Sequence, residues 1–269
     1  MWRLPDTPGS YIIDRRRRSI DLAHRKVAPV VSLVECVVSE ELTLWVGEFD
    51  PTAVVPKSFS VGDHEFRRLL DHFHLPAVPD SALSVALFDL CADAYEMLVD
   101  VKRNISNIQN LLVVVLAAGK SGADTIKILD FGCGTGLSLV ALQSLESNSV
   151  GRIQLTGMDR SPHMLQIAAR RGLSVLTEAK WASLLAGTFH AVIASYVIHL
   201  GMSQDDCCAI AKQLIPGGVF VANYHHGDAT GVAQTAALLS RAGLRPIPLP
   251  PIDCGTPGNP TVLFGKART

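Results

Sequence analysis

The chain has 269 residues, of which 48% are hydrophobic and 18% are charged, and its formal net charge is -1. This composition suits a folded protein with a sizeable core and excludes a disordered chain. The near-zero charge gives no general attraction to nucleic acid or to anionic membranes. The run Arg15–Arg18 is a local exception. We interpret it as a solvated face, with phosphate binding as the alternative.

The cysteines and the apolar runs indicate the compartment. Six cysteines include no CxxC pair and no Cys/His spacing typical of zinc, so we expect no metal centre. Their scatter without a disulfide framework favours a reducing environment. The first residues lack the apolar core of a signal peptide, and the run Leu111–Ala118 is too short to span a bilayer. We therefore expect a cytoplasmic protein with no membrane segment.

The N-terminal region is expected to be a separate part of the chain. Val37–Glu48 has the composition of a hairpin with its turn at Ser39–Glu41, and Val61–His74 is predicted to be helical. We expect residues 1–80 to form an extension or a substrate cap. Residues 81–269 would then form the main domain.

The main domain is predicted to have an α/β fold. Apolar residues from Leu87 to Val115 recur at helical spacing, which indicates one long helix or two helices broken near Asn104–Ser106. Beyond residue 127, short β-rich runs alternate with helical patterns. This order predicts a seven-stranded, mostly parallel sheet flanked by helices. The expected strands are Lys127–Phe131, Arg152–Asp159, Leu173–Thr177, Phe189–Ser195, Gly218–Tyr224, Leu244–Leu249 and Thr261–Gly265.

A glycine-rich segment follows the first of these strands. Gly132, Gly134 and Gly136 alternate with other residues just before a helix that opens at Leu137. Glycine lets the backbone turn sharply and approach a ligand without a Cβ, and the helix points its N–H groups at the same place. A dinucleotide fingerprint would need a small third residue inside the helix, where Leu137 and Leu139 stand. The spacing therefore disfavours a nicotinamide cofactor.

The segment resembles the first motif of the class I S-adenosylmethionine-dependent methyltransferases, D-x-G-x-G-x-G. Asp130, Gly132, Gly134 and Gly136 match it residue by residue, and the resemblance extends from about Leu87 to the C-terminus. It implies a Rossmann-like methyltransferase fold with S-adenosylmethionine as cofactor. The glycine loop would wrap the methionine and ribose parts of the cofactor, and Asp130 would help to position the amino group.

Later motifs of the family follow in order. Asp159 ends the second strand, where the resemblance implies hydrogen bonds to both ribose hydroxyls. Met164 matches a position that packs on adenine in relatives, with ordinary helix packing as the alternative. Glu178 and Ala179 stand where the family often has an Asp-Ala pair that accepts from the adenine amino group. His190 stands where an aspartate is usual.

Other residues complete the predicted cofactor site. Tyr95 aligns with a tyrosine that contacts the cofactor carboxylate in some relatives, although ordinary packing would also explain it. Cys133, Arg160 and Ser195 lie within or beside the motifs and are included in the site.

Two histidines are candidates for catalysis. Ligands of open α/β sheets bind beyond the carboxyl ends of the strands, and His199 and His225 follow the fourth and fifth strands there. Either imidazole could act as a general base for a hydroxyl or amine acceptor. A structural role for His199 is an equal alternative.

Motifs that are missing from the sequence limit the class of methyl acceptor. Ser195 and Asn223 stand where metal-dependent catechol-type relatives have acids, and the Asn/Asp-Pro-Pro-Tyr box of nucleobase enzymes is absent. Aromatic residues are too sparse for a base-stacking platform. We expect a small-molecule acceptor, free or bound to an acyl or peptidyl carrier, and no nucleic-acid partner. Three alternatives stay open. The chain could be a methyltransferase-like protein that binds cofactor or partner without methyl transfer, or it could catalyse another reaction on the same fold, such as a cyclisation. The third is a macromolecular acceptor, for which Arg15–Arg18 is the only local support.

Overall fold

The computed structural model describes residues 10–15, 30–37, 42–49, 57–61, 64–70, 73–77, 81–118, 125–145, 153–224, 229–250 and 261–267. Its contacts divide the chain into two compact units, Met1–Val99 and Asp100–Thr269. The functional boundary that the sequence places after residue 80 stays a prediction. Among the described residues no helix is long and apolar enough to cross a membrane. No group of His, Cys, Asp and Glu in these residues could hold a metal ion.

The first unit contains a mixed six-stranded sheet with the order β2-β3-β1-β6-β5-β4. β2 and β3 pair antiparallel, which confirms the predicted hairpin, although its turn lies outside the described residues, as do Arg16–Arg18. The strands are β1 Ser10–Arg15, β2 Val30–Val37, β3 Leu42–Phe49, β4 Ser58–Val61, β5 His64–Leu69 and β6 Phe73–Pro76.

The helix predicted over Val61–His74 is wrong, because β5 and β6 occupy this stretch as an antiparallel pair. Phe66 is fully buried between the exposed Glu65 and Arg67, which is the two-residue alternation of a strand. Its ring stacks on Phe59 of β4 with centroids 5.3 Å apart. These cross-strand contacts stabilise the strand conformation, although the spacing of the apolar residues favours a helix.

The long predicted helix is broken, but not at residues 104–106. α1 (Ser81–Cys91), a 3-10 turn and α2 (Tyr95–Leu98) belong to the first unit, and α3 (Val101–Ala118) belongs to the second. Val99 between α2 and α3 has extended backbone, with φ -124° and ψ 154°. The Asp100 carboxylate accepts the Arg103 N–H at 3.0 Å and so caps the new helix.

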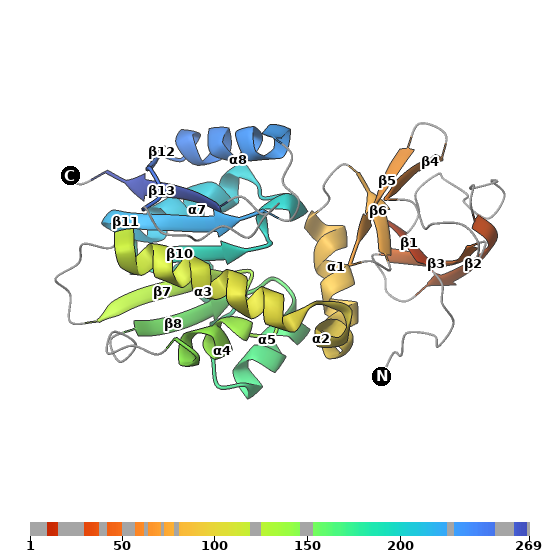
Figure 1. Ribbon diagram of the computed structural model, residues 1–269, viewed down its shortest axis with the longest axis horizontal. Helices are drawn as coiled ribbons and strands as arrows, with labels where there is room; N and C mark the ends of the chain where they lie inside the picture. Colours follow the sequence, from red (N-terminus) through yellow and green to blue (C-terminus); the bar gives the residue numbers. More distant parts are fainter. Residues whose placement is uncertain are drawn as a thin grey trace. The chain divides into compact units, whose positions relative to one another are not determined.

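The second unit is built on a seven-stranded sheet with the order β12-β13-β11-β10-β7-β8-β9 (Figure 1). β13 runs antiparallel to both of its neighbours, and the other strands are parallel to one another. This confirms the predicted fold class. The strands are β7 Ile126–Phe131, β8 Ile153–Met158, β9 Ser174–Leu176, β10 Phe189–Ser195, β11 Leu214–Asn223, β12 Leu244–Pro246 and β13 Thr261–Lys266.

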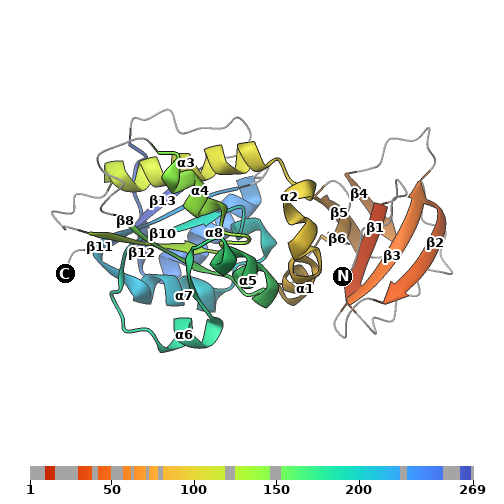
Figure 2. The same cartoon turned by 90° about the horizontal axis from the view of Figure 1, so that it is seen from below.

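Helices cover both faces of this sheet. In β10, Ala191 and Ile193 pack in one apolar core with α3, α4 and α5, whereas Val192 and Ala194 pack in a second core with α6, α7 and α8. Figure 2 shows α3 and α4 on one side of the sheet and α6 and α7 on the other. The remaining helices are α4 Leu137–Gln143, α5 Pro162–Arg170, α6 Glu178–Ser183, α7 Gln204–Gln213 and α8 Ala229–Arg241.

β11 begins at Leu214, four residues before the predicted start at Gly218, so Pro216 and Gly217 lie inside the strand. The β10–β11 register shifts here, because Phe189 pairs with Leu214 whereas Ala191 pairs with Val219. A Cβ at Gly218 would lie 3.0 Å from the His190 carbonyl oxygen. Proline and glycine therefore form an irregular strand start instead of a separate turn.

Candidate functional site

The glycine-rich loop joins β7 to α4 in a backbone conformation that favours glycine. Gly132, Gly134 and Gly136 have φ values of 76°, 52° and 82°. The N–H groups of Gly132 and Cys133 both donate to the carbonyl oxygen of Met158, at 2.7 and 3.0 Å. The loop is therefore fixed to the carboxyl end of the neighbouring strand β8.

The three glycines differ in what surrounds them. A Cβ at Gly132 would collide with a methyl group of Val197, and one at Gly136 would lie 3.1 Å from the Cα of Ala168. At Gly134, by contrast, a Cβ would meet no atom of the described residues within 4 Å. Gly132 and Gly136 thus serve close packing. The space over Gly134 is open to a ligand.

Asp159 follows β8 directly and is in contact with this loop. Its Oδ2 accepts the Gly134 N–H at 2.8 Å, and its Oδ1 accepts the Ser161 N–H at 2.9 Å. Ser161 in turn caps α5, because its Oγ accepts the Met164 N–H at 3.1 Å. A carboxylate oxygen can accept more than one hydrogen bond. The structure therefore brings together two residues, Gly134 and Asp159, that the sequence placed in one site.

Two predicted site residues, Asp130 and Cys133, are buried. Asp130, the fifth residue of β7, is 3% exposed, and burial raises its pKa to about 7, with the nearby Asp159 charge adding to the effect and Ser138 opposing it. Burial also raises the pKa of the Cys133 thiol well above its usual range. A Cβ at Gly157 would lie 2.7 Å from the Cys133 sulfur, so this side chain fills the interior.

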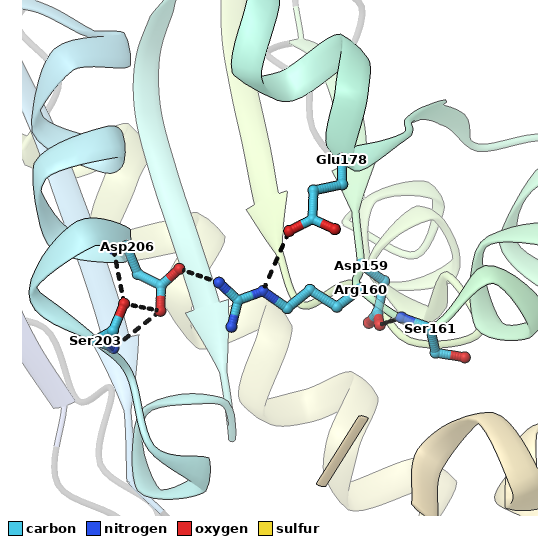
Figure 3. Close-up of polar contacts among 6 residues, drawn as sticks. All are labelled: Asp159, Arg160, Ser161, Glu178, Ser203 and Asp206. Atoms are coloured by element: carbon cyan, nitrogen blue, oxygen red, sulfur yellow. Dashed lines mark hydrogen bonds and ion pairs between the residues drawn. The ribbon is translucent and has the colours of Figure 1, made fainter. Parts of the chain in front are cut away.

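Arg160 extends from the end of β8 toward α7 (Figure 3). One guanidinium nitrogen, Nη2, lies 2.6 Å from Asp206 Oδ1, and Nε lies 4.0 Å from Glu178 Oε1. The Glu178 side chain is 71% exposed, so its ion pair is weak. Glu178 and Ala179 begin α6, whose N-cap is Thr177, and both are exposed. The structure thus places an arginine beside the glutamate that was predicted to contact adenine.

The remaining predicted residues lie at different depths. Met164 is 1% exposed on α5. Ser195 is the last residue of β10, and its Oγ is buried without a hydrogen-bond partner among the described residues. His199 lies in the 3-10 turn Ile198–Leu200 that follows β10. His225 lies outside the described residues.

Tyr95 belongs to the first unit, where it begins α2. Its ring meets Phe88 edge to face with centroids 6.1 Å apart. Tyr95 thus packs against a residue of its own unit. The contact of Tyr95 with the cofactor stays a prediction.

His190 shows what replaces the usual aspartate of the family. Its Nδ1 accepts the backbone N–H of Lys127 at the start of β7, at 3.1 Å. Burial and the charge of Lys127 lower the pKa of His190, which favours the neutral imidazole that such an acceptor requires. The substitution keeps a contact between neighbouring strands.

Tyr196 is a residue that the sequence did not single out. It follows β10 with a φ of 58°, which is uncommon for a bulky side chain. Its N–H donates to the buried Asn223 side chain at 2.8 Å, and its hydroxyl forms a hydrogen bond with Asn107 of α3. Burial raises the pKa of this hydroxyl, opposed mainly by the charge of Arg103. Strained backbone of this kind gathers at ligand sites, and the sequence carries no local signal for it.

Comparison with known proteins finds a family that matches part of the second unit. The family described as "Methyltransferase domain" matches residues 128–218, the segment from the middle of β7 to the start of β11. The glycine loop, Asp159 and the strand order around them are the parts of the fold that this match contains. Over this segment the match agrees with the predicted resemblance to the class I methyltransferases. S-adenosylmethionine is the cofactor of this methyltransferase domain.

Several solved structures are similar to parts of this chain at low sequence identity. A chain from the complex between the Haloferax volcanii Trm112 methyltransferase activator and a candidate methyltransferase is 18% identical. The match covers 67% of the present chain and 97% of that chain, with a TM-score of 0.48. An S-adenosylmethionine-dependent methyltransferase from Mesorhizobium loti is 20% identical over 56% and 95% of the two chains, with a TM-score of 0.41. The [4+2]-cyclase SpnF is 20% identical over 63% and 75%, with a TM-score of 0.43. No curated protein sequence matches the chain.

Proposed function

We propose that this methyltransferase domain is an active enzyme that transfers a methyl group from S-adenosylmethionine to a small-molecule acceptor. The observation that carries the proposal is the open space over Gly134, directly beside the Asp159 carboxylate. A Cβ would occupy this space, and a carboxylate at its edge is the acceptor that ribose hydroxyls require. The backbone and the charge of the site therefore fit the cofactor.

The other predicted residues are assigned around this point. Asp130 would meet the amino group, and Glu178 and Ala179 would lie by the adenine. The rest of the proposed cofactor site comprises Tyr95, Gly132, Cys133, Gly136, Arg160, Met164 and Ser195. When bound, the cofactor supplies an electrophilic methyl group on a sulfonium centre.

The chain's own contribution would be to align the acceptor and exclude water. His199 follows β10 at the carboxyl edge of the sheet, where an imidazole can accept a proton from a hydroxyl or an amine. We propose it as the general base, with His225 as a second candidate. A small acceptor, free or bound to a carrier protein, agrees with the missing nucleobase and metal-dependent motifs. We further propose that the N-terminal unit recognises this acceptor.

The test is methyl transfer by the full chain. Purified protein is incubated with methyl-labelled S-adenosylmethionine and a panel of hydroxyl, amine and carbon acceptors, both free and carrier-bound. We expect label in one acceptor class. A loss of 10²- to 10⁴-fold in kcat is expected for His199→Gln, with cofactor affinity unchanged. Gly134→Val serves as the control that cannot bind the cofactor.

Two results would overturn the proposal. If the protein binds the cofactor but labels no acceptor and converts none, it is a binding protein on a methyltransferase fold. If an acceptor is converted without gaining label, the fold catalyses another reaction, such as a cyclisation.

A further inference from the structure

We propose that Arg160, which the sequence includes in the cofactor site, serves that site as a positioning residue through Asp206 and not by contact with a ligand. Its ion pair would hold the Asp159 carboxylate in place and join it to the segment that carries His199. The effect on cofactor binding depends only on the cofactor site. The effect on turnover rests on the proposed function.

One end of this connection is the turn after β8. Asp159 and Ser161 are joined by the 2.9 Å hydrogen bond described above, and Arg160 lies between them in sequence. The backbone of Arg160 is therefore held on both sides, while its side chain reaches out of the turn (Figure 3). Fixing the guanidinium group restricts the turn, and with it the carboxylate that accepts from Gly134.

The other end is the first turn of α7. Asp206 is 7% exposed, and its Oδ2 accepts from both the N–H and the hydroxyl of Ser203, at 2.9 and 2.8 Å. The Ser203 Oγ accepts the Asp206 N–H at 3.1 Å, which completes a capping box. Oδ1 of Asp206 is the atom that meets Arg160. The anchor of the arginine is thus itself fixed by three hydrogen bonds.

His199 precedes this capping box by only four residues. The 3-10 turn that contains it ends at Leu200, and Gly201 then takes the left-handed conformation with a φ of 98° before the chain reaches Ser203. The short, ordered connection means that a shift of the α7 N-terminus also displaces the 3-10 turn. The Arg160–Asp206 pair therefore links the turn after β8 to the turn after β10.

The geometry favours a directed role over a general charge effect. At 2.6 Å the contact is a short, charge-assisted hydrogen bond, and its carboxylate is largely removed from water. The capping box needs no arginine, because Ser203 and Asp206 already satisfy each other. The arginine instead pairs with Oδ1 of the largely buried Asp206 carboxylate and so ties α7 to the turn after β8.

The experiment compares four single variants of the full chain for binding of S-adenosylhomocysteine by calorimetry, together with their melting temperatures. We expect Arg160→Met to weaken binding roughly tenfold, and Arg160→Lys to recover part of this loss. Arg170→Met removes the same charge from the exposed end of α5 and should stay within about twofold of wild type. Ser203→Ala removes two of the hydrogen bonds that fix Asp206, so it should lower the melting temperature and weaken binding, but by less than Arg160→Met, which removes the ion pair itself.

A double-mutant cycle separates positioning from ligand contact. In an Asp206→Asn background, Arg160→Met should have a much smaller effect on affinity than in wild type. If Arg160→Met binds like wild type, or weakens binding equally in both backgrounds, the proposal is overturned. If Arg160→Met does not fold, the comparison of Arg160→Lys and Asp206→Asn with their Arg160→Lys/Asp206→Asn double variant provides the same cycle.

Turnover supplies the second readout. At saturating cofactor and acceptor, Arg160→Met should lower kcat, whereas the matched control Arg170→Met should not. An unchanged kcat for Arg160→Met would contradict the link to His199. The binding measurement needs no methyl transfer. If the proposed function is wrong, the affinities still test the role of Arg160, and the two failures can be told apart.

Discussion

Two turns at neighbouring strand ends use left-handed backbone in different ways. After β7, the chain enters this conformation at glycines, whose φ values cost little. After β10, it does so at Tyr196, where the side chain makes the conformation costly and the Asn223 side chain holds the backbone N–H. The two turns also touch, because Val197 packs where a Cβ of Gly132 would lie.

The difference shows two ways of building a rigid site. The glycine turn is stabilised through its backbone N–H groups, which donate to the carbonyl oxygen of Met158 and to the carboxylate of Asp159. The Tyr196 turn depends on side chains from α3 and β11, which are distant in sequence. The first turn should therefore respond to added volume, and the second to lost hydrogen bonds.

The buried charge on the glycine side should give the largest effect. The pKa of Asp130 is raised from its ordinary value of 3.8 to about 7, so the folded state keeps its proton at pH values where the unfolded state has lost it. Below pH 4 the protonated Asp130 makes its whole contribution to the free energy of unfolding, roughly 4 kcal/mol at most. This contribution is lost as the pH rises through 7.

Urea unfolding between pH 4 and pH 8 measures this contribution. Asp130→Asn lacks the titrating group, so its stability should fall less over this range than that of wild type. Parallel curves for the two proteins would contradict the burial argument.

A methyl group at Gly132 should give the next largest effect. Gly132→Ala adds both a strained φ and a collision with Val197, for a cost of about 2 to 4 kcal/mol in the free energy of unfolding. Val197→Ala in the same chain should recover the steric part and leave the backbone strain. If the second substitution recovers nothing, the two turns do not pack as described.

In the Tyr196 turn, removal of the Asn223 side-chain acceptor should give the third largest effect. Asn223→Leu leaves the Tyr196 N–H without its acceptor and should cost about 1 to 3 kcal/mol in chemical denaturation. Asn223→Asp keeps an acceptor oxygen and, measured at acidic pH where a buried carboxyl is neutral, should recover most of the loss. Equal losses in both variants would show that packing, and not this hydrogen bond, stabilises the turn.

Gly134 should give the smallest effect on stability. Gly134→Ala adds backbone strain but no collision, so we expect a loss of about 1 to 2 kcal/mol, well below that of Gly132→Ala. Thermal unfolding of the two variants side by side checks the order. A loss at Gly134 equal to that at Gly132 would mean that the space above Gly134 is filled.

Local patterns were enough to predict the glycine side of the site. The loop, Asp159 and the seven strands could be located because each depends on residues adjacent in sequence, such as the strand that ends at Phe131. The same approach failed at residues 61–74. There the helical spacing of apolar residues competed with cross-strand packing of Phe66, which no local pattern shows.

The Tyr196 side could not be predicted for a related reason. Tyr196 meets Asn107 and Asn223 only after folding, and none of the three belongs to a recognisable motif. Arg160 was placed in the site from its neighbours alone, and its partner Asp206 became visible only in the structure. Contacts between distant side chains are what the sequence leaves undetermined.

We propose that the glycine turn and Asp159 hold the cofactor. The most direct measurement is a calorimetric titration of S-adenosylmethionine and S-adenosylhomocysteine into wild type, Gly134→Val and Asp159→Ala. The account predicts binding at about micromolar Kd by the wild type and its loss in both variants, with the fold retained by circular dichroism. A well-folded wild type that binds neither ligand, or variants that bind as tightly as wild type, would contradict it.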